Sequence, residues 1–227
     1  MRRRPSPTSM RAMRPLTTFL FDLDGTLLDS IRLILDSYHH TLRVHGHAPR
    51  SDAEWLAGVG TPLRVQFRDW THDPVTMEAM IATYRDFNLA NHDTMASAYP
   101  GVVEAVKSVH RRGIRMGIVT SKNRAGAERG LKLMGLEQEF SLIIGADDVV
   151  NPKPHPEPVL KALDQLGVSA EESVYIGDSV HDMHSGKAAG VRTAAVLWGP
   201  FGRQDLVHTE PTWWLERPEE LAELVSK

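Results

Sequence analysis

The sequence predicts an α/β fold in which helices cover both faces of a parallel sheet and a helical segment is inserted near the N-terminus. Short apolar runs rich in β-favouring residues alternate with amphipathic stretches after residue 95, and one more such run lies at residues 17–22. Between them, residues 30–94 show helical periodicity and no convincing strand. Alternating strands and helices are typical of βαβ units. We therefore expect a disordered tail over 1–15, a core over 16–29 and 95–227, and a helical insert over 30–94.

The first predicted strand is TTFLFD, residues 17–22, an apolar run that ends at a carboxylate followed two residues later by another carboxylate and a glycine. This pattern indicates a buried strand that ends in a loop. After it, Ser30 is a suitable N-cap for a helix whose apolar positions from Ile31 to Leu42 recur at helical spacing. Further helices of the insert are expected at 52–57, 62–70 and 74–91.

The pattern changes at Tyr99-Pro100-Gly101, where strands and helices begin to alternate. Helices are expected at 101–112, 123–134, 156–166, 181–189 and 218–226. Strands are expected at 115–120, 141–145, 173–177 and 193–197, with a further strand around Trp213 and Trp214. This order is that of a doubly covered parallel sheet.

The composition is that of an ordinary globular chain of 227 residues, 41% hydrophobic and 24% charged. The net charge of −3 gives no electrostatic case for nucleic acid as the main partner. No apolar run is long enough to span a bilayer, and the Arg-rich first fifteen residues have no apolar stretch of the kind a secretory signal contains. The absence of cysteine excludes thiol catalysis and fits a reducing compartment, so we expect a cytoplasmic protein, as a monomer or a homodimer.

Polar side chains follow four of the predicted strands, where the chain leaves the sheet. Asp22 and Asp24 follow the first strand, Thr120 and Ser121 the second, Asp147 and Asp148 the third, and Asp178 the fourth, while Lys153 lies in the loop before a helix. The carboxyl ends of parallel strands lie at one edge of a sheet, where ligands bind. Aspartate also favours turns and helix caps, which explains one or two of these residues but not an Asp-x-Asp-Gly-Thr run directly after a buried strand.

This set of side chains suits the hydrolysis of a phosphate monoester, whose negative charge repels an anionic nucleophile. A hard cation such as Mg²⁺, bound by the carboxylates of Asp22 and Asp178, shields that charge. The cation keeps Asp22 ionised as the nucleophile, and Asp24 protonates the leaving group and later accepts a proton from water. Lys153 offsets negative charge, and Thr120 donates a hydrogen bond to a phosphoryl oxygen.

Four segments resemble the motifs of the haloacid dehalogenase-like hydrolases, in the order and strand context of that family. They are FDLDGTLLDS at 21–30, GIVTS at 117–121, the lysine of NPKPHPEP at 151–158, and GDSVHDM at 177–183. Three outer segments, YRDFNLANHD at 84–93, GLKLMGL at 130–136 and TAAVLWGPFGR at 193–203, are similar to the branch that contains phosphoglycolate phosphatases and pyrophosphatases. The resemblance covers almost the whole chain after residue 16.

The resemblance implies a Rossmann-like sheet and a helical cap over residues 30–94 that closes over the substrate. It also implies that Asp22 binds the metal through its side chain and Asp24 through its backbone carbonyl, with Asp178 as a further ligand. Asp182 would lie in or near the metal shell. Possible supporting or substrate-binding residues are Gly25, Thr26 and Ser121 of the motifs, together with Arg64, which follows the turn at residues 58–62 and could bind a second anionic group.

We therefore expect a Mg²⁺-dependent phosphatase that acts on a small phosphorylated metabolite and is similar to phosphoglycolate phosphatases. The alternatives are an inorganic pyrophosphatase of the same family and a sugar phosphomutase, which would use the same two aspartates. A dehalogenase is disfavoured because Asp24 has no role in that chemistry, and a non-catalytic binding module is disfavoured because every required group is present. A zinc site at the clustered histidines of residues 39–47 is disfavoured because no HExxH motif or cysteine accompanies them.

Overall fold

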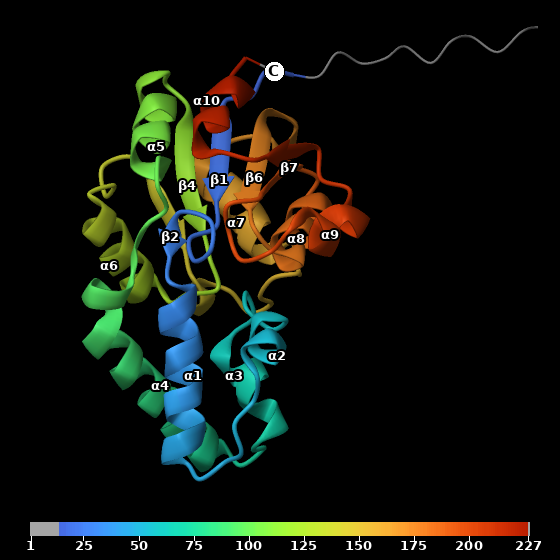
Figure 1. Cartoon of the computed structure of the whole chain (residues 1–227). Helices are drawn as coiled ribbons and strands as arrows, with labels where there is room; N and C mark the ends of the chain where they lie inside the picture. The colour runs from blue at the N-terminus through green and yellow to red at the C-terminus, as the bar shows by residue number, and fades with distance from the viewer. Residues whose placement is uncertain (1–13, 227) are drawn as a thin grey trace, which may run out of the picture.

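The structure is a computed structural model that describes residues 14–226, and most of the predicted N-terminal tail therefore lies outside the described residues. Arg14, which the prediction placed in that tail, forms ion pairs with Glu171 and Glu172. The chain forms a sheet with helices on both faces and a helical lobe at one end of it (Figure 1).

The main sheet has six strands, all parallel, in the order β5-β4-β1-β6-β7-β8. Each expected strand is present within about two residues of its predicted bounds, a difference that is usual for strand ends. The bounds are β1 Thr18–Phe21, β4 Arg115–Val119, β5 Leu142–Ile144, β6 Ser173–Gly177, β7 Arg192–Val196 and β8 Trp213–Leu215. The prediction of a parallel α/β sheet is confirmed.

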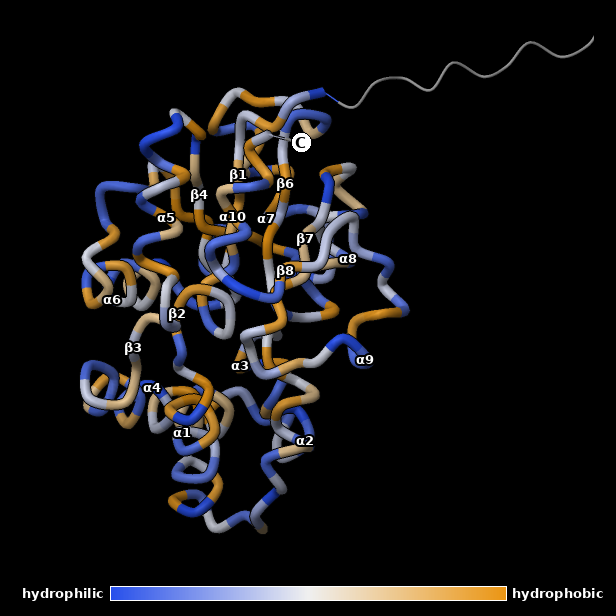
Figure 2. Tube along the Cα trace, turned by 45° about the horizontal axis from the view of Figure 1, so that its top comes forward, coloured by the Kyte–Doolittle hydropathy of each residue, from blue (hydrophilic) through white to orange (hydrophobic). Residues whose placement is uncertain are grey.

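Successive side chains of each strand point to opposite faces of the sheet, and apolar clusters cover both faces. Apolar residues therefore predominate along the central strands (Figure 2). Phe19 and Phe21 of β1 belong to an apolar cluster formed with helices α5 Val102–Arg111, α6 Arg124–Met134 and α10 Leu221–Leu224. Leu20, on the opposite face of β1, belongs to the cluster that contains α7 Glu157–Leu166.

The remaining helices of the core are α8 Val180–Ala188, which packs against β6 and β7, and the short α9 Arg203–Leu206. The predicted helix over 218–226 is shorter than expected. A 3-10 turn at Pro218–Glu220 precedes α10, and Leu221 and Leu224 are the apolar anchors of that last helix. A helix as short as α10 forms few backbone hydrogen bonds, so its length is set by the contacts of its buried side chains.

The residues between β2 and β3 are helical and pack around an apolar cluster of their own. Their helices are α1 Ile31–Val44, α2 Asp52–Leu56, α3 Leu63–Gln66 and α4 Pro74–Met95. Trp55 is fully buried and stacks on Tyr38 with ring centroids 4.0 Å apart, and Phe67 packs edge-on against both rings. The helix expected over 62–70 is divided into α3 and a 3-10 turn at Phe67–Asp69. We call residues 31–95 the helical insert.

Two strands of two residues each were not expected from the sequence. β2 Leu28–Asp29 and β3 Ser97–Ala98 pair in antiparallel fashion where the chain enters and leaves the helical insert. Two residues are too few to show the alternation of apolar and polar positions that predicts a strand. These strands form only because the two segments that connect the core to the insert lie side by side. Within residues 14–226, no helix combines the length and the apolar character needed to cross a membrane.

Candidate active site

The predicted acidic residues lie where the order of the strands reverses. From β1 the chain moves to β4 and β5 on one side, and then returns to β6 on the other side of β1. The connections therefore diverge between β1 and β6, which opens a crevice at the carboxyl ends of these two strands. Asp22 follows β1 directly, and Asp178 follows β6 directly.

Asp22, Asp178 and Asp182 form a buried cluster of carboxylates, in which one oxygen of each lies within 4.8 Å of those of the other two. Asp22 and Asp178 are 4% and 1% exposed. Asp178 Oδ1 accepts a hydrogen bond from the Thr26 hydroxyl at 2.8 Å, while Asp178 Oδ2 and Asp22 Oδ1 are buried without a hydrogen-bond donor. Buried oxygens of this kind normally have partners, so the pair is suited to a ligand with positive charge.

Burial is the main cause that raises the pKa of Asp22 to about 7, and the neighbouring charge of Asp182 raises it further, while Lys153 lowers it. Burial also raises the pKa of Asp178 well above its usual range, with the charges of Asp182 and Asp22 acting in the same direction. Asp22 and Asp178 therefore retain their protons to a higher pH than an exposed aspartate does.

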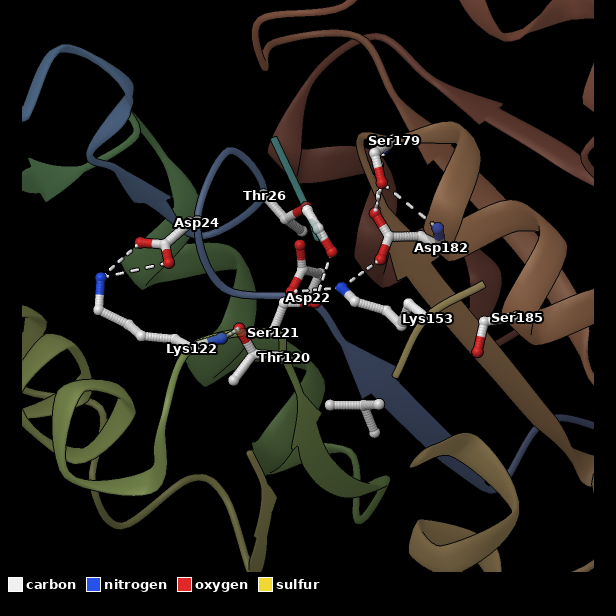
Figure 3. A network of polar contacts seen from close by, with 12 residues as sticks. Asp22, Asp24, Thr26, Thr120, Ser121, Lys122, Lys153, Ser179, Asp182 and Ser185 are labelled. Carbon is white, nitrogen blue, oxygen red and sulfur yellow. Dashed lines mark hydrogen bonds and ion pairs between the residues drawn. The ribbon is translucent and has the colours of Figure 1, made fainter. Parts of the chain in front are cut away.

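Lys153 is the cation that the chain itself supplies to this cluster (Figure 3). It is 2% exposed, and its Nζ lies 2.6 Å from Asp182 Oδ1 and 3.0 Å from Asp22 Oδ1. The contact with Asp22 is an ion pair without the direction of a hydrogen bond, so that oxygen keeps a free lone pair. Burial alone would lower the pKa of Lys153, but the two carboxylates raise it, and the ammonium stays charged.

Asp182 differs from the other two acids because both of its oxygens are already engaged. Oδ1 accepts from Lys153 and from the Tyr175 hydroxyl at 2.9 Å, and Oδ2 accepts from the backbone N–H of Ser179 at 3.0 Å and its hydroxyl at 2.6 Å. Burial would raise the pKa of Asp182, but Lys153 and the Ser179 donors outweigh it and lower that pKa. Asp182 is thus an anchor for Lys153 and the first turn of α8 rather than an open ligand.

Gly25 lets the loop after β1 pass close to Asp178. Its φ is +86°, in the left-handed region, and a Cβ at this position would lie 2.6 Å from Asp178 Oδ2. Only glycine satisfies both conditions without displacement. Thr26 then lies where its hydroxyl reaches Asp178.

Asp24 lies on the other side of Asp22 from Lys153 and has a different partner (Figure 3). Its Oδ1 accepts from Lys122 Nζ at 2.9 Å and from the Ser30 hydroxyl at 2.6 Å. Lys122 was not among the predicted site residues. It lies two residues beyond Thr120, so the expectation that polar residues after a strand line the ligand site applies to it as well. Asp24 is therefore charge-compensated by a second lysine.

The loop after β4 also contacts the helical insert. The Ser121 hydroxyl donates to the Gly60 carbonyl at 2.5 Å, and a Cβ on Gly60 would lie 3.4 Å from the Ser179 hydroxyl. Thr120 is 5% exposed and borders the cavity described below. Its hydroxyl oxygen accepts from the Lys122 backbone N–H at 3.2 Å. The turn at residues 58–62 therefore lies against the loops that follow β4 and β6.

A cavity of about 490 Å³ separates the core from the helical insert. Asp22, Asp24, Thr120 and Lys122 line it from the core. Arg64 lines it from α3, but its guanidinium donates to Glu78 and is half exposed. The predicted anion-binding residue thus borders the cavity with its charge already paired.

The two acids after β5 are not part of the acidic cluster, although Asp147 lines the same cavity as Asp22 and Thr120. Asp147 Oδ1 accepts from the Arg124 backbone N–H at 2.9 Å. Asp148 Oδ2 accepts from the Gly145 backbone N–H at 2.8 Å and from the Arg124 side chain at 2.9 Å. These contacts close the β5 loop onto the start of α6, which is the ordinary use of aspartate in turns.

The donor set fits a hard divalent cation. Two buried carboxylates each have an oxygen without a hydrogen-bond donor, no softer ligand is among the three acids, and a glycine keeps the space beside Asp178 clear. Carboxylate oxygens are the ligands that Mg²⁺ prefers. Asp22 and Asp178 are close enough to share one ion, as the sequence analysis requires.

The sequence and the fold place this chain among known proteins. It is 41% identical over 210 residues to the pyrophosphatase PpaX of Anoxybacillus flavithermus, covering 92% of this chain and 97% of that protein. It is 42% identical over 212 residues to PpaX of Halalkalibacterium halodurans, with the same coverage. A crystal structure from Bacteroides fragilis, described as a haloacid dehalogenase-like hydrolase, superposes with a TM-score of 0.85 at 29% identity over 91% of this chain and 99% of that one. Residues 19–196 match the sequence profile of that family, and the chain therefore belongs to the haloacid dehalogenase-like hydrolases.

Proposed function

We propose that this chain is a Mg²⁺-dependent hydrolase of inorganic pyrophosphate. The observation that carries the proposal is a pair of buried carboxylate oxygens without a hydrogen-bond donor, on Asp22 and Asp178 next to Lys153, and Asp22 also lines the cavity. The substrate follows from the relatives, because the two full-length relatives named above are pyrophosphatases. Pyrophosphate was an alternative in the sequence analysis, and we now prefer it to 2-phosphoglycolate.

In the proposed reaction, an Asp22 carboxylate oxygen attacks phosphorus and the bond from phosphorus to the bridging oxygen breaks. The electron pair of that bond goes to the leaving phosphate, which takes a proton from Asp24. Water then attacks the phosphorus of the aspartyl phosphate, gives a proton to Asp24 and releases phosphate together with the free Asp22 carboxylate. Lys153 and Thr120 hold the transferred group by charge and by hydrogen bonding.

Lys122 also lines the cavity, where it pairs with the Asp24 carboxylate. An entering phosphate group offers Lys122 another anionic partner.

Asp22 and Asp178 would hold the metal ion, with the Asp24 backbone carbonyl as a further ligand. The ion would supply charge neutralisation for the nucleophile and for the phosphoryl oxygens. We also propose that the helical insert acts as a cap, and the contact of Ser121 with Gly60 supports this role, since it ties the insert to the catalytic edge of the sheet.

The test of the proposed function is a phosphate-release assay with Mg²⁺ on pyrophosphate, 2-phosphoglycolate, small sugar phosphates and nucleoside monophosphates. We expect pyrophosphate to give the highest kcat/KM. A higher value for a phosphate monoester would contradict the substrate, and isomerised sugar phosphate without free phosphate would indicate a phosphomutase.

The stabilisation of the protein by Mg²⁺ is expected to grow with pH. The folded-state pKa of Asp22, about 7, lies above the ordinary value of 3.8, and that of Asp178 is also raised. The metal-free protein therefore loses stability as pH rises through this range, while Mg²⁺ binds the ionised forms. Melting curves with and without Mg²⁺ should differ more at about pH 8 than at about pH 5.5. KCl of equal ionic strength is the control, and an equal shift at both pH values would contradict the carboxylate site.

Gly25→Ala is expected to weaken Mg²⁺ binding as well as stability, because the new methyl group displaces Asp178. The matched control is Gly113→Ala, since Gly113 has a φ of +78° but no atom within 4 Å of its added Cβ. Both variants should lose about 1 kcal/mol from backbone strain. Only Gly25→Ala should also require more Mg²⁺ for half-maximal phosphate release, and equal Mg²⁺ requirements in the two variants would refute the crowding of Asp178.

A further inference from the structure

His92 is a buried histidine of the helical insert that no step above uses. It lies near the end of α4 and is 1% exposed, and it borders the same cavity as Asp22 and Lys122. Arg85 and Asn88 precede it by seven and four residues, so the three lie along one face of α4, which lines the cavity from the insert. The cavity therefore has a polar stripe opposite the acidic cluster.

The His92 ring is held by a partner that is itself fixed. Nδ1 of His92 lies 2.8 Å from Asp93 Oδ1. Arg129 of α6 binds the same carboxylate through two hydrogen bonds, at 2.9 and 3.0 Å. Hydrogen bonds from Arg129 and then from His92 lower the pKa of Asp93 to about 2, so Asp93 is an anion that orients the ring. A carboxylate that accepts a hydrogen bond from one ring nitrogen fixes whether the other nitrogen acts as a donor or as an acceptor.

The other ring nitrogen, Nε2, is buried and has no hydrogen-bond partner. Because Asp93 occupies the Nδ1 edge, Nε2 is the ring nitrogen left without a protein partner in a residue that lines the cavity. A buried nitrogen without a partner costs free energy in either protonation state. A phosphate oxygen resolves this cost, because it accepts from an imidazolium, and a protonated phosphate donates to a neutral ring.

Acids as well as bases line the cavity, and most of these charges are paired, Lys122 with Asp24 and Arg64 with Glu78. Lys122 lines it from the core, and Arg85 lines it from α4 without an ion pair among the described residues. Arg85 is thus a cation without an ion pair on the face of α4 that also carries His92, and the part of the substrate that is not attacked would lie against this face.

We propose that His92 is a substrate-binding residue whose Nε2 contacts the leaving phosphate group of a diphosphate substrate. This inference rests on the proposed function, since it assigns the second phosphate of pyrophosphate to a place in the cavity. Through this contact, His92 would favour substrates whose leaving group is a phosphate over substrates whose leaving group is not.

Two variants separate the two ring nitrogens. Asn at position 92 retains a polar atom near the place of Nδ1 and removes the Nε2 function, whereas Gln places its amide near Nε2. We expect His92→Asn to lower the ratio of kcat/KM for pyrophosphate to kcat/KM for 4-nitrophenyl phosphate by about tenfold or more, mainly through the KM for pyrophosphate. His92→Gln should recover part of this loss. His72→Asn, at an exposed histidine of the insert, is the control and should match the wild type.

A binding measurement makes the test independent of turnover. The imidazole ¹⁵N signals of His92 should shift when methylenediphosphonate, which cannot be hydrolysed, is added to the Mg²⁺-loaded protein. An unchanged signal, or an equal loss on both substrates in folded His92→Asn, would overturn the inference. If the wild type binds methylenediphosphonate with this shift but does not hydrolyse pyrophosphate, the proposed function fails while the contact of His92 stands.

Discussion

Asp22→Asn is expected to reduce phosphate release by about 10⁴-fold or more, the order found when a covalent nucleophile is removed. An amide oxygen is a poor nucleophile, and it cannot supply the negative charge that a cation at this site requires. The substitution retains the shape of the side chain and removes a charge that burial disfavours. The metal-free variant should therefore melt no lower than the wild type at about pH 8, while its stabilisation by Mg²⁺ becomes smaller.

Acid quenching of the reaction with labelled pyrophosphate tests the covalent step directly. The wild-type protein should retain label as an aspartyl phosphate that is stable in acid and lost in base, and Asp22→Asn should retain none. Asp86→Asn, at an exposed carboxylate of α4, is the control. It should behave as the wild type in phosphate release, in melting and in the retention of label after acid quenching. Normal phosphate release by Asp22→Asn would remove Asp22 from the role of nucleophile.

Much of the core was predictable from the sequence because its strands are buried on both faces. The strand Thr18–Phe21 is buried at every position and apolar after Thr18, and it ends where Asp22 and Gly25 interrupt the apolar run. The strand-end rule then predicts that Asp22 and Asp178 converge, because parallel neighbours end at the same edge. That convergence is present in the structure.

The same rule failed where aspartate has a structural use. Asp147 and Asp148 also follow a strand, but they accept hydrogen bonds from their own loop and from Arg124. Sequence position alone cannot distinguish an aspartate that stabilises its own turn from an aspartate that is available to a ligand, since both lie in a turn after a strand. The difference appears only in the partners, which Asp147 and Asp148 have and Asp178 Oδ2 lacks.

Contacts between the core and the helical insert were the least predictable features. Ser121 and Gly60 are 61 residues apart in the chain, and neither residue type indicates a contact. His92 lies within a helix whose pattern predicts only its apolar face, and its importance depends on Arg129, which belongs to the core. Such sites arise where two separately packed units meet, so they require the three-dimensional arrangement.

Lys153→Met is expected to destabilise the metal-free protein by about 3–5 kcal/mol, the cost of leaving a buried charge without its partner. Methionine fills similar space, so the loss of charge dominates. Asp22, Asp178 and Asp182 would then have no cation among them, and their pKa values would rise. Because folded-state pKa values above the ordinary value make stability fall as pH rises, the deficit should be larger at about pH 8 than at about pH 5.5.

Chemical denaturation of Lys153→Met without Mg²⁺ measures this deficit, and Lys132→Met, at an exposed lysine of α6, is the control. Adding Asp22→Asn to Lys153→Met should recover part of the stability, since one of the uncompensated carboxylates is gone. The recovery in the double variant should exceed the effect of Asp22→Asn in the wild-type background, because the two residues are in contact. Strictly additive effects would mean that Lys153 stabilises the site through Asp182 alone, and that Asp22 depends on the metal ion for its negative charge.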